Sequence, residues 1–290
     1  MRSQLTMLNS MASEDFLTAL ARHHEWGLKW LDLRDAIFGH KIATLDVLTA
    51  TKASKEIEKN NLSVFCLSSS VFFEKIEEGL AVFKEKHLGK LDEIIKVAKI
   101  LKPTYVRLIA AQLPSRELGQ DSIKLIRAKY PWLIDVYREA IDRLTDAGLR
   151  PTIENEAFAC FLSEPGEFLD FFDWLDRKKS VGLTWDVQNQ WATGSYPDLP
   201  TYQKLKHLIQ YYHVKGGQAD ESGRKLKWNV ALEDASWPVV EITRQVVADG
   251  VSPVICLNPA QHGEQKPGYD YNDLVKRDID FLRRSVPGIE

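Results

Sequence analysis

Eight short apolar segments alternate along the chain with longer amphipathic stretches. The short segments have the length and composition of buried β-strands, and the longer ones repeat apolar residues at helical spacing. Strands followed each time by a helix are typical of a (β/α)8 barrel, so we predict a single barrel domain over residues 1–290. An open doubly wound sheet is the alternative, but the glycine-rich phosphate turns of such sheets are absent. The predicted strands are residues 4–8, 28–34, 63–69, 104–111, 150–156, 181–187, 209–215 and 252–258.

Polar residues recur on one side of several predicted strands. Neighbouring residues of a strand face opposite sides, so Glu154 and Glu156 share one face, as do His213 and Lys215. In strand 181–187, the polar Asp186 shares its face with small residues, whereas the apolar residues occupy the other face. These polar sets lie near the carboxyl ends of their strands, where (β/α)8 barrel enzymes place their active sites. We therefore predict an active site at that end of the barrel.

Composition excludes several classes of protein. The formal net charge is −3, so no overall positive field favours a nucleic-acid partner. No apolar run approaches 18 residues, and we expect no membrane segment and no targeting segment. The 3 cysteines show no CxxC spacing, which is typical of a reducing compartment. We expect a cytoplasmic protein with a small-molecule substrate.

Glu154, Asp186 and His213 form the most informative set. They end three consecutive predicted strands and lie 32 and then 27 residues apart, about one strand–helix unit each time. Two carboxylates and one imidazole suit a divalent cation such as Mn²⁺, Mg²⁺, Co²⁺ or Zn²⁺. The alternative is that each is a polar strand end with hydrogen-bond partners of its own. Three such residues converging inside one barrel favour a metal site, because buried charges are costly without partners.

A resemblance supports this prediction. The order of the segments at successive strand ends is similar to that of the sugar phosphate isomerase/epimerase group, which belongs to the xylose-isomerase-like TIM barrels. The resemblance covers about residues 25–265. DNA-repair barrels of the endonuclease IV type are also related, but the acidic net charge disfavours that activity. The segments that carry the resemblance are LKWLDLRDAIFGHKIATL, VFCLSSSVF, YVRLIA, TIENE, LTWDVQN, YHVKGG and CLNP.

The resemblance implies a TIM barrel with one divalent metal ion, held by Glu154, Asp186, His213 and a fourth residue. Relatives have glutamate at the fourth position, where this chain has Asn258. Asparagine offers an amide oxygen, but it carries no negative charge and accepts no proton near neutral pH. Asn258 therefore weakens the expected metal affinity and disfavours a reaction that needs two carboxylates.

Further residues are implied as substrate contacts. The resemblance matches Asn189 to a position that touches substrate or metal in relatives, and it matches Arg107 and Lys215 to residues common in the family. Glu156 shares the inner face with Glu154, and Trp191 is expected in the loop after the sixth strand as a pocket residue. Three cations, Arg34, Arg107 and Lys215, are expected near the mouth and could bind a phosphate or carboxylate, with Arg107 as the preferred contact. The alternative is that they neutralise Asp32, Glu154 and Glu156 in internal ion pairs. His262, in the loop after the last strand, is a candidate for proton transfer.

Together these observations predict a metal-dependent isomerase or epimerase for a small sugar, sugar phosphate or polyhydroxy acid. Glu154 would abstract a proton, and the metal would stabilise the resulting enediolate. The alternative is a sugar-binding or regulatory barrel that has lost catalysis, which the uncharged Asn258 motivates. The resemblance also admits a homo-oligomer, whereas nucleic-acid and membrane partners are not expected.

Overall fold

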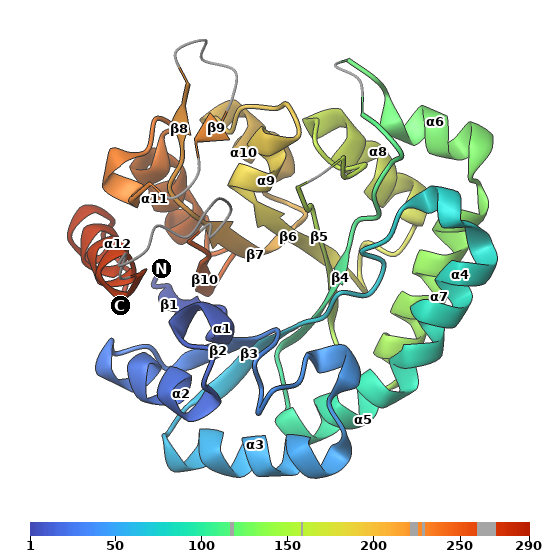
Figure 1. Cartoon of the computed structure of the whole chain (residues 1–290). Helices are drawn as coiled ribbons and strands as arrows, with labels where there is room; N and C mark the ends of the chain where they lie inside the picture. Colours follow the sequence, from blue (N-terminus) through green and yellow to red (C-terminus); the bar gives the residue numbers. More distant parts are fainter. Residues whose placement is uncertain (117–118, 158, 221–225, 228–229, 260–270) are drawn as a thin grey trace.

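The chain folds as a (β/α)8 barrel, which confirms the predicted fold (Figure 1). The computed structural model describes residues 1–116, 119–157, 159–220, 226–227, 230–259 and 271–290. Eight parallel strands follow each other in the order β1-β10-β7-β6-β5-β4-β3-β2. They are β1 (Gln4–Met7), β2 (Trp30–Leu33), β3 (Ser63–Ser68), β4 (Tyr105–Ile109), β5 (Pro151–Glu154), β6 (Gly182–Asp186), β7 (Ile209–Val214) and β10 (Val254–Leu257). Each lies within a predicted strand.

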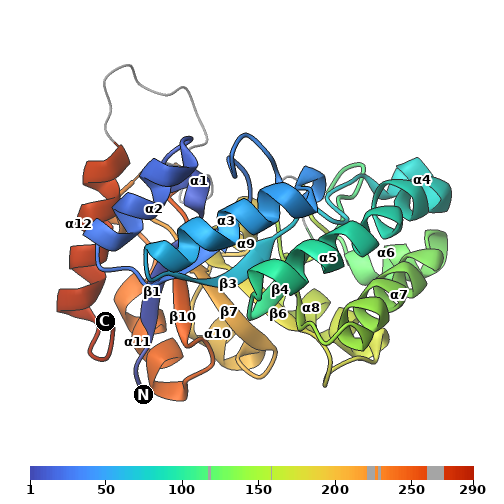
Figure 2. The same ribbon diagram turned by 90° about the horizontal axis from the view of Figure 1, so that it is seen from below.

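The first two strands close the barrel. Leu8 forms a parallel bridge with Asp32, and Thr6 Oγ1 donates a hydrogen bond to Trp30 O at 2.7 Å. The two ends of the chain lie close together (Figure 2), where Ser3 N donates to Gly288 O at 2.9 Å. β10, the last strand of the chain, pairs in parallel with β1, the first, and Thr6 lies opposite Cys256. Closure brings the carboxyl ends of all these strands to one mouth.

Helices form a ring around the strands (Figure 1). An antiparallel pair, β8 (Gln218–Ala219) and β9 (Leu226–Lys227), and a 3-10 turn, η4 (Leu232–Asp234), follow β7. No helix in the described ranges is long and apolar enough to cross a membrane. The helices are α1 (Asn9–Ala12), α2 (Phe16–Glu25), α3 (Val47–Lys59), α4 (Gly79–Lys86), α5 (Leu91–Leu101), α6 (Ser122–Lys129), α7 (Trp132–Asp146), α8 (Pro165–Leu175), α9 (Val187–Ala192), α10 (Leu199–Leu205), α11 (Val239–Asp249) and α12 (Tyr271–Ser285).

The core has two parts, one between the strands and the helices and one inside the barrel. Trp185 and Tyr212 belong to the outer part, as the alternation of side chains predicts. Inside the barrel, Thr184 Oγ1 donates to Thr152 Oγ1 at 2.8 Å. A separate aromatic and sulfur cluster also fills the interior, comprising Leu8, Phe65, Cys66, Tyr105, Tyr211, Val254 and Cys256. The barrel is therefore a packed core whose polar residues lie towards the mouth.

Candidate functional site

Glu154, Asp186 and His213 meet inside the barrel. They stand on the adjacent strands β5, β6 and β7, and all are buried. His213 Nδ1 lies 3.1 Å from Glu154 Oε1 and 4.0 Å from Asp186 Oδ2. One ligand atom from each side chain lies within 4.8 Å of the other two. The structure therefore brings together the three residues that the sequence analysis singled out.

Two buried cations neutralise the carboxylates. Arg107 Nη1 donates to Glu154 Oε2, and Lys215 Nζ lies 2.8 Å from Asp186 Oδ2. Burial alone would raise the pKa of Glu154, but the charges of Arg107 and His213 outweigh it and lower that pKa to about 2. Glu154 is therefore ionised at neutral pH, and its second oxygen, Oε1, faces His213.

The local sequence after β6 orients Asp186. Its Oδ1 accepts hydrogen bonds at 3.0 Å from the backbone N–H groups of Gln188 and Asn189 and so caps α9. Asn155 fixes the Asp186 backbone from the neighbouring strand through hydrogen bonds of 2.8 and 2.9 Å. Only Oδ2 of Asp186 remains to face Lys215, His213 and Asn258. The sequence analysis did not identify the role of Asn155, although it directly follows Glu154.

Capping by Asp186 also changes the expected place of Trp191. This residue lies in a helix, α9, where a loop was expected, because the Asp186 carboxylate starts the helix immediately after the strand. Its side chain is 4% exposed, belongs to the main hydrophobic core and packs edge-on against Tyr196. Trp191 does not line the cavity described below. His262 lies outside the described residues.

The other predicted polar residues surround the three central side chains. Asn258 Nδ2 donates to Asp186 Oδ2 at 3.2 Å, and rotation of that amide would present its oxygen at the same place. Asn189 Nδ2 donates to Glu156 Oε1 at 3.0 Å, and Asn189 Oδ1 accepts from Lys215 Nζ at 3.0 Å. Burial and the neighbouring charge of Glu154 raise the pKa of Glu156. Asn189 thus positions both Glu156 and Lys215.

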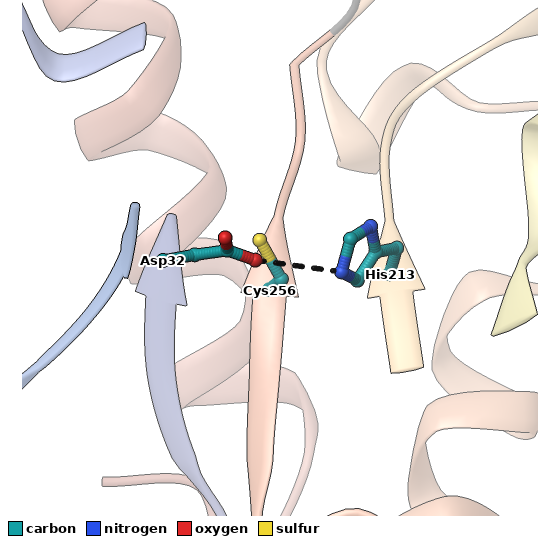
Figure 3. Close-up of side chains that lie close together, drawn as sticks. All are labelled: Asp32, His213 and Cys256. Atoms are coloured by element: carbon teal, nitrogen blue, oxygen red, sulfur yellow. Dashed lines mark ion pairs between the residues drawn. The ribbon is translucent and has the colours of Figure 1, made fainter. Parts of the chain in front are cut away.

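Asp32 is a member of this cluster that the sequence analysis did not identify as a site residue. Figure 3 shows it facing His213, with Cys256 between β2 and β7. Asp32 Oδ2 lies 3.7 Å from His213 Nε2 and accepts a hydrogen bond from Tyr211 Oη at 2.9 Å. Burial raises the pKa of Asp32 and of the Cys256 thiol. The sequence does contain a signal for Asp32. Side chains alternate along strand 28–34, and this alternation turns Asp32 towards the barrel interior, as it does Glu154 on its own strand.

The residues present fit a divalent metal ion. Within the described ranges, the buried atoms His213 Nε2 and Asp32 Oδ1 have no hydrogen bond, and His213 Nδ1, although 3.1 Å from Glu154 Oε1, makes none of regular geometry. Buried polar atoms without partners are rare in folded proteins and call for an explanation such as an ion. Two carboxylates and an imidazole also match the ligand preference of divalent transition metals and Mg²⁺. The Asp32 carboxylate stands behind His213, as outer carboxylates do behind metal-binding histidines.

A cavity of about 480 Å³ opens above these residues. Its volume lies within the usual range for small-molecule sites. Asn189 does not line the cavity, but it is hydrogen-bonded to Glu156 and Lys215, which do. The predicted site residues that line the cavity are Arg107, Glu154, Glu156, Lys215 and Asn258. The remaining lining residues are Leu8, Met11, Arg34, Asp35, Lys41, Ile42, Ala43, Ser68, Ser69, Ser70, Phe73 and Ile109.

Solved structures of a sugar epimerase and of a probable dehydratase share this architecture. D-Psicose 3-epimerase with D-tagatose from Clostridium cellulolyticum is 10% identical, has a TM-score of 0.74, and 99% of each chain is covered. A probable 3-DHS dehydratase from Bacillus anthracis is 15% identical, with a TM-score of 0.71 and coverage of 97% of this chain and 98% of that one. At these identities, the likeness concerns the fold.

One solved structure of the same fold contains a metal. A xylose isomerase-like TIM barrel protein from Mycobacterium smegmatis, in complex with magnesium, is 16% identical. Its TM-score is 0.69, and 98% of this chain and 96% of that chain are covered. A comparison with curated protein sequences finds no significant match. The family model for xylose isomerase-like TIM barrels matches residues 20–285, and the chain therefore belongs to that family.

Proposed function

We propose that this protein is a metal-dependent isomerase or epimerase that acts on a small carbohydrate. The observation that carries the proposal is the convergence of Glu154, Asp186 and His213 beneath the 480 Å³ cavity. A sugar of five or six carbons fits a cavity of this size, and the polar lining offers partners to its hydroxyl groups. The structural neighbours named as epimerases support the same reaction class.

Glu154, Asp186 and His213 would hold one divalent ion, Mn²⁺, Mg²⁺, Co²⁺ or Zn²⁺, with the amide oxygen of Asn258 as a fourth ligand. When bound, such an ion supplies positive charge that polarises carbonyl and hydroxyl oxygens. Arg107 keeps Glu154 ionised and orients it, since it binds Oε2 and leaves Oε1 directed inward. Lys215 and Asn189 together hold Asp186 and Glu156 in place.

Glu154 acts in this proposal as the base that removes a proton from the carbon beside the substrate carbonyl. The protonated carboxyl group, whose proton exchanges with solvent, then protonates the former carbonyl carbon, while the hydroxyl proton of the first carbon passes to the former carbonyl oxygen. The product of these steps is that of an aldose–ketose isomerisation. Asn258 bears on this choice because an amide accepts no proton at neutral pH. A reaction that uses a single carboxylate therefore suits this chain better than an epimerisation that needs carboxylates on both faces of the substrate.

The test is exchange of substrate hydrogen with deuterium from solvent, followed by NMR. D-Fructose, D-tagatose, D-allulose and their phosphate esters are incubated with chelated protein, with and without added Mn²⁺, Mg²⁺, Co²⁺ or Zn²⁺. We expect exchange only after metal addition, and a fall of about 10²- to 10⁴-fold in E154Q, the usual effect of losing a general base. Full exchange by E154Q would exclude this role for Glu154.

A matched control is E58Q, which removes the same charge from an exposed position on α3. It should exchange hydrogen as the wild type does. Thermal unfolding of E154Q shows whether the variant is folded, because the change also leaves Arg107 without its carboxylate partner. Absence of exchange by the metal-loaded wild type with every sugar would contradict the proposed function.

A further inference from the structure

The cavity extends well beyond the candidate metal ligands. Its opposite wall is formed by the segments that follow β2 and β3, including Arg34, Lys41 and Ser70. Arg107 lies between the two walls, since it lines the cavity and holds Glu154. A ligand that reaches from Glu154 across this space would meet cations at its far end.

The segment that carries Arg34 and Lys41 is held at several points. Buried Asn9 accepts from Arg34 N at 2.9 Å and donates to Asp35 O at 2.6 Å. Ile42 N donates to Arg34 O at 3.1 Å, which ties the end of the segment to its beginning. Between these points Ile37 and His40 exchange backbone hydrogen bonds of 2.9 and 3.0 Å. The two cationic side chains therefore extend from an ordered support.

The cations of this wall have fewer hydrogen-bond and ion-pair partners than the cation beside Glu154. Arg34 bonds to Asp35 through Nε at 3.2 Å and to Ser10 Oγ through Nη2 at 3.1 Å. Within the described residues, Arg34 Nη1 has no hydrogen bond, and Lys41 Nζ has no carboxylate within 4.0 Å. By contrast, Arg107 is already paired with Glu154. The cavity thus presents donors for an additional anion at Arg34 and Lys41.

We infer that Arg34 and Lys41 bind an anionic group of the substrate, a phosphate ester or a carboxylate, at the end of the cavity opposite Glu154. Arginine suits this role because its planar donors match either oxyanion, and lysine adds a flexible charge. The hydroxyl of exposed Ser70 provides another donor on the same wall. This inference rests on the proposed function and specifies its substrate as a sugar phosphate or a sugar acid.

Calorimetric titration of metal-free protein in the presence of EDTA tests the inference without turnover. The probes are D-fructose, D-fructose 6-phosphate, D-gluconate and inorganic phosphate. We expect at least one of the two anionic carbohydrates to bind about 10- to 100-fold more tightly than D-fructose, the range for hydrogen bonds to charged groups. The preferred probe distinguishes a phosphate site from a carboxylate site, and added salt should weaken its binding.

The double variant R34Q/K41Q should lose this preference while its affinity for D-fructose stays unchanged. K55Q, which removes an exposed charge from α3, should retain the preference. K41Q alone alters an exposed side chain and provides a folded variant if the double variant unfolds. Equal affinities for neutral and anionic probes, or a preference that survives in R34Q/K41Q, would overturn the inference. Because no turnover is measured, these results are independent of the hydrogen-exchange test of Glu154.

Discussion

The two walls of the cavity are built in different ways. The first, which we call the carboxylate wall, consists of Glu154, which lines the cavity, and of Asp186 and His213, which lie beneath it; all three are carried by strands and are fully buried. The second, which we call the cationic wall, consists of Arg34, Lys41 and Ser70, carried by loops and partly exposed. Strands place reactive groups more accurately than loops, whereas loops adjust more easily to different ligands. Under the proposed function, reaction chemistry and substrate choice would therefore be separated between the two walls of this barrel.

The energetic consequences also differ. On the carboxylate wall, each carboxylate is desolvated and depends on a buried cation. Removal of one partner there leaves a charge that water cannot reach. On the cationic wall, solvent screens the pair formed by Arg34 and Asp35, so its loss costs little. The same chemical change should therefore have unequal effects on the two walls.

Replacing arginine on each wall tests this difference and gives the largest expected effect. R107M should lower the free energy of unfolding by about 3 kcal/mol, because Glu154 is left buried without its cation. R34M should lower it by less than about 1 kcal/mol. The exposed fractions of the two side chains, 5% for Arg107 and 35% for Arg34, set this order. Urea unfolding at pH 7 measures both values.

The double variant R107M/E154Q is the control for the buried pair. It removes both charges, so it should recover part of the stability that R107M loses. Similar losses in R107M and R34M would show that the two walls do not differ in the way described. A loss in the double variant equal to the sum of the single losses would show that Arg107 and Glu154 are not coupled.

The fold could be predicted from the sequence because barrel strands leave two regular signals. Apolar segments of similar length recur at intervals set by the helices between them, and side chains alternate across each strand. The second signal predicts that Glu154, Asp186 and His213 lie on the interior side. Gly148 and Gly250, each with positive φ, follow α7 and α11 at the positions where the helical pattern ends.

Other features depend on contacts between distant residues and left weaker signals. Asp32 approaches His213 only because the barrel closes, and no spacing in the chain expresses that distance. Trp191 was misplaced because the capping of α9 by Asp186 depends on the geometry at the strand end. The support of the cationic wall by Asn9 joins two segments through side-chain hydrogen bonds, which periodicity does not report. Sequence patterns therefore predict which residues face inward better than which of them pair.

A buried histidine that bonds to the loop after β3 makes the protein sensitive to acid. His87 Nδ1 accepts a hydrogen bond from Phe72 N at 3.1 Å, in the loop that follows β3. Burial lowers the pKa of His87 to about 4, with Glu74 opposing and the nearby Lys86 and Lys90 assisting. The unfolded chain, with an ordinary pKa of 6.5, binds the proton more readily, so stability falls as pH drops below 6.5 and continues to fall towards 4. Between pH 7 and pH 5 we expect a loss of about 2 kcal/mol from this group.

H87Q should remove this part of the acid sensitivity, since glutamine cannot become charged. Urea unfolding of the wild type and the variant at pH 7 and pH 5 gives the difference. H24Q is the matched control, because His24 is exposed on α2, and its pH dependence should match that of the wild type. An unchanged pH dependence in H87Q would show that Phe72 and its loop do not require a neutral histidine.

A buried carboxyl group on α12 gives a pH effect opposite to that of His87, and it is the smallest effect expected. Asp278 of α12 accepts a hydrogen bond from Leu232 N at 2.7 Å and so holds η4, which follows β7 and its hairpin. Burial raises the pKa of Asp278 to about 7, although Leu232 and Arg277 oppose the shift. The folded chain therefore binds this proton more tightly than the unfolded chain, and stability falls as pH rises from about 4 through 7.

Between pH 6 and pH 8, this group should account for a loss of about 1 kcal/mol in the wild type. D278N should not show that loss, because its amide oxygen still accepts from Leu232 N and does not ionise. Asp280 of the same helix is exposed, so D280N should retain the pH dependence of the wild type. Urea unfolding of the wild type and both variants at pH 6 and pH 8 measures this difference in the free energy of unfolding. If D278N loses as much stability as the wild type, Asp278 is ionised throughout this range, and His87 and Asp278 do not have opposite pH responses.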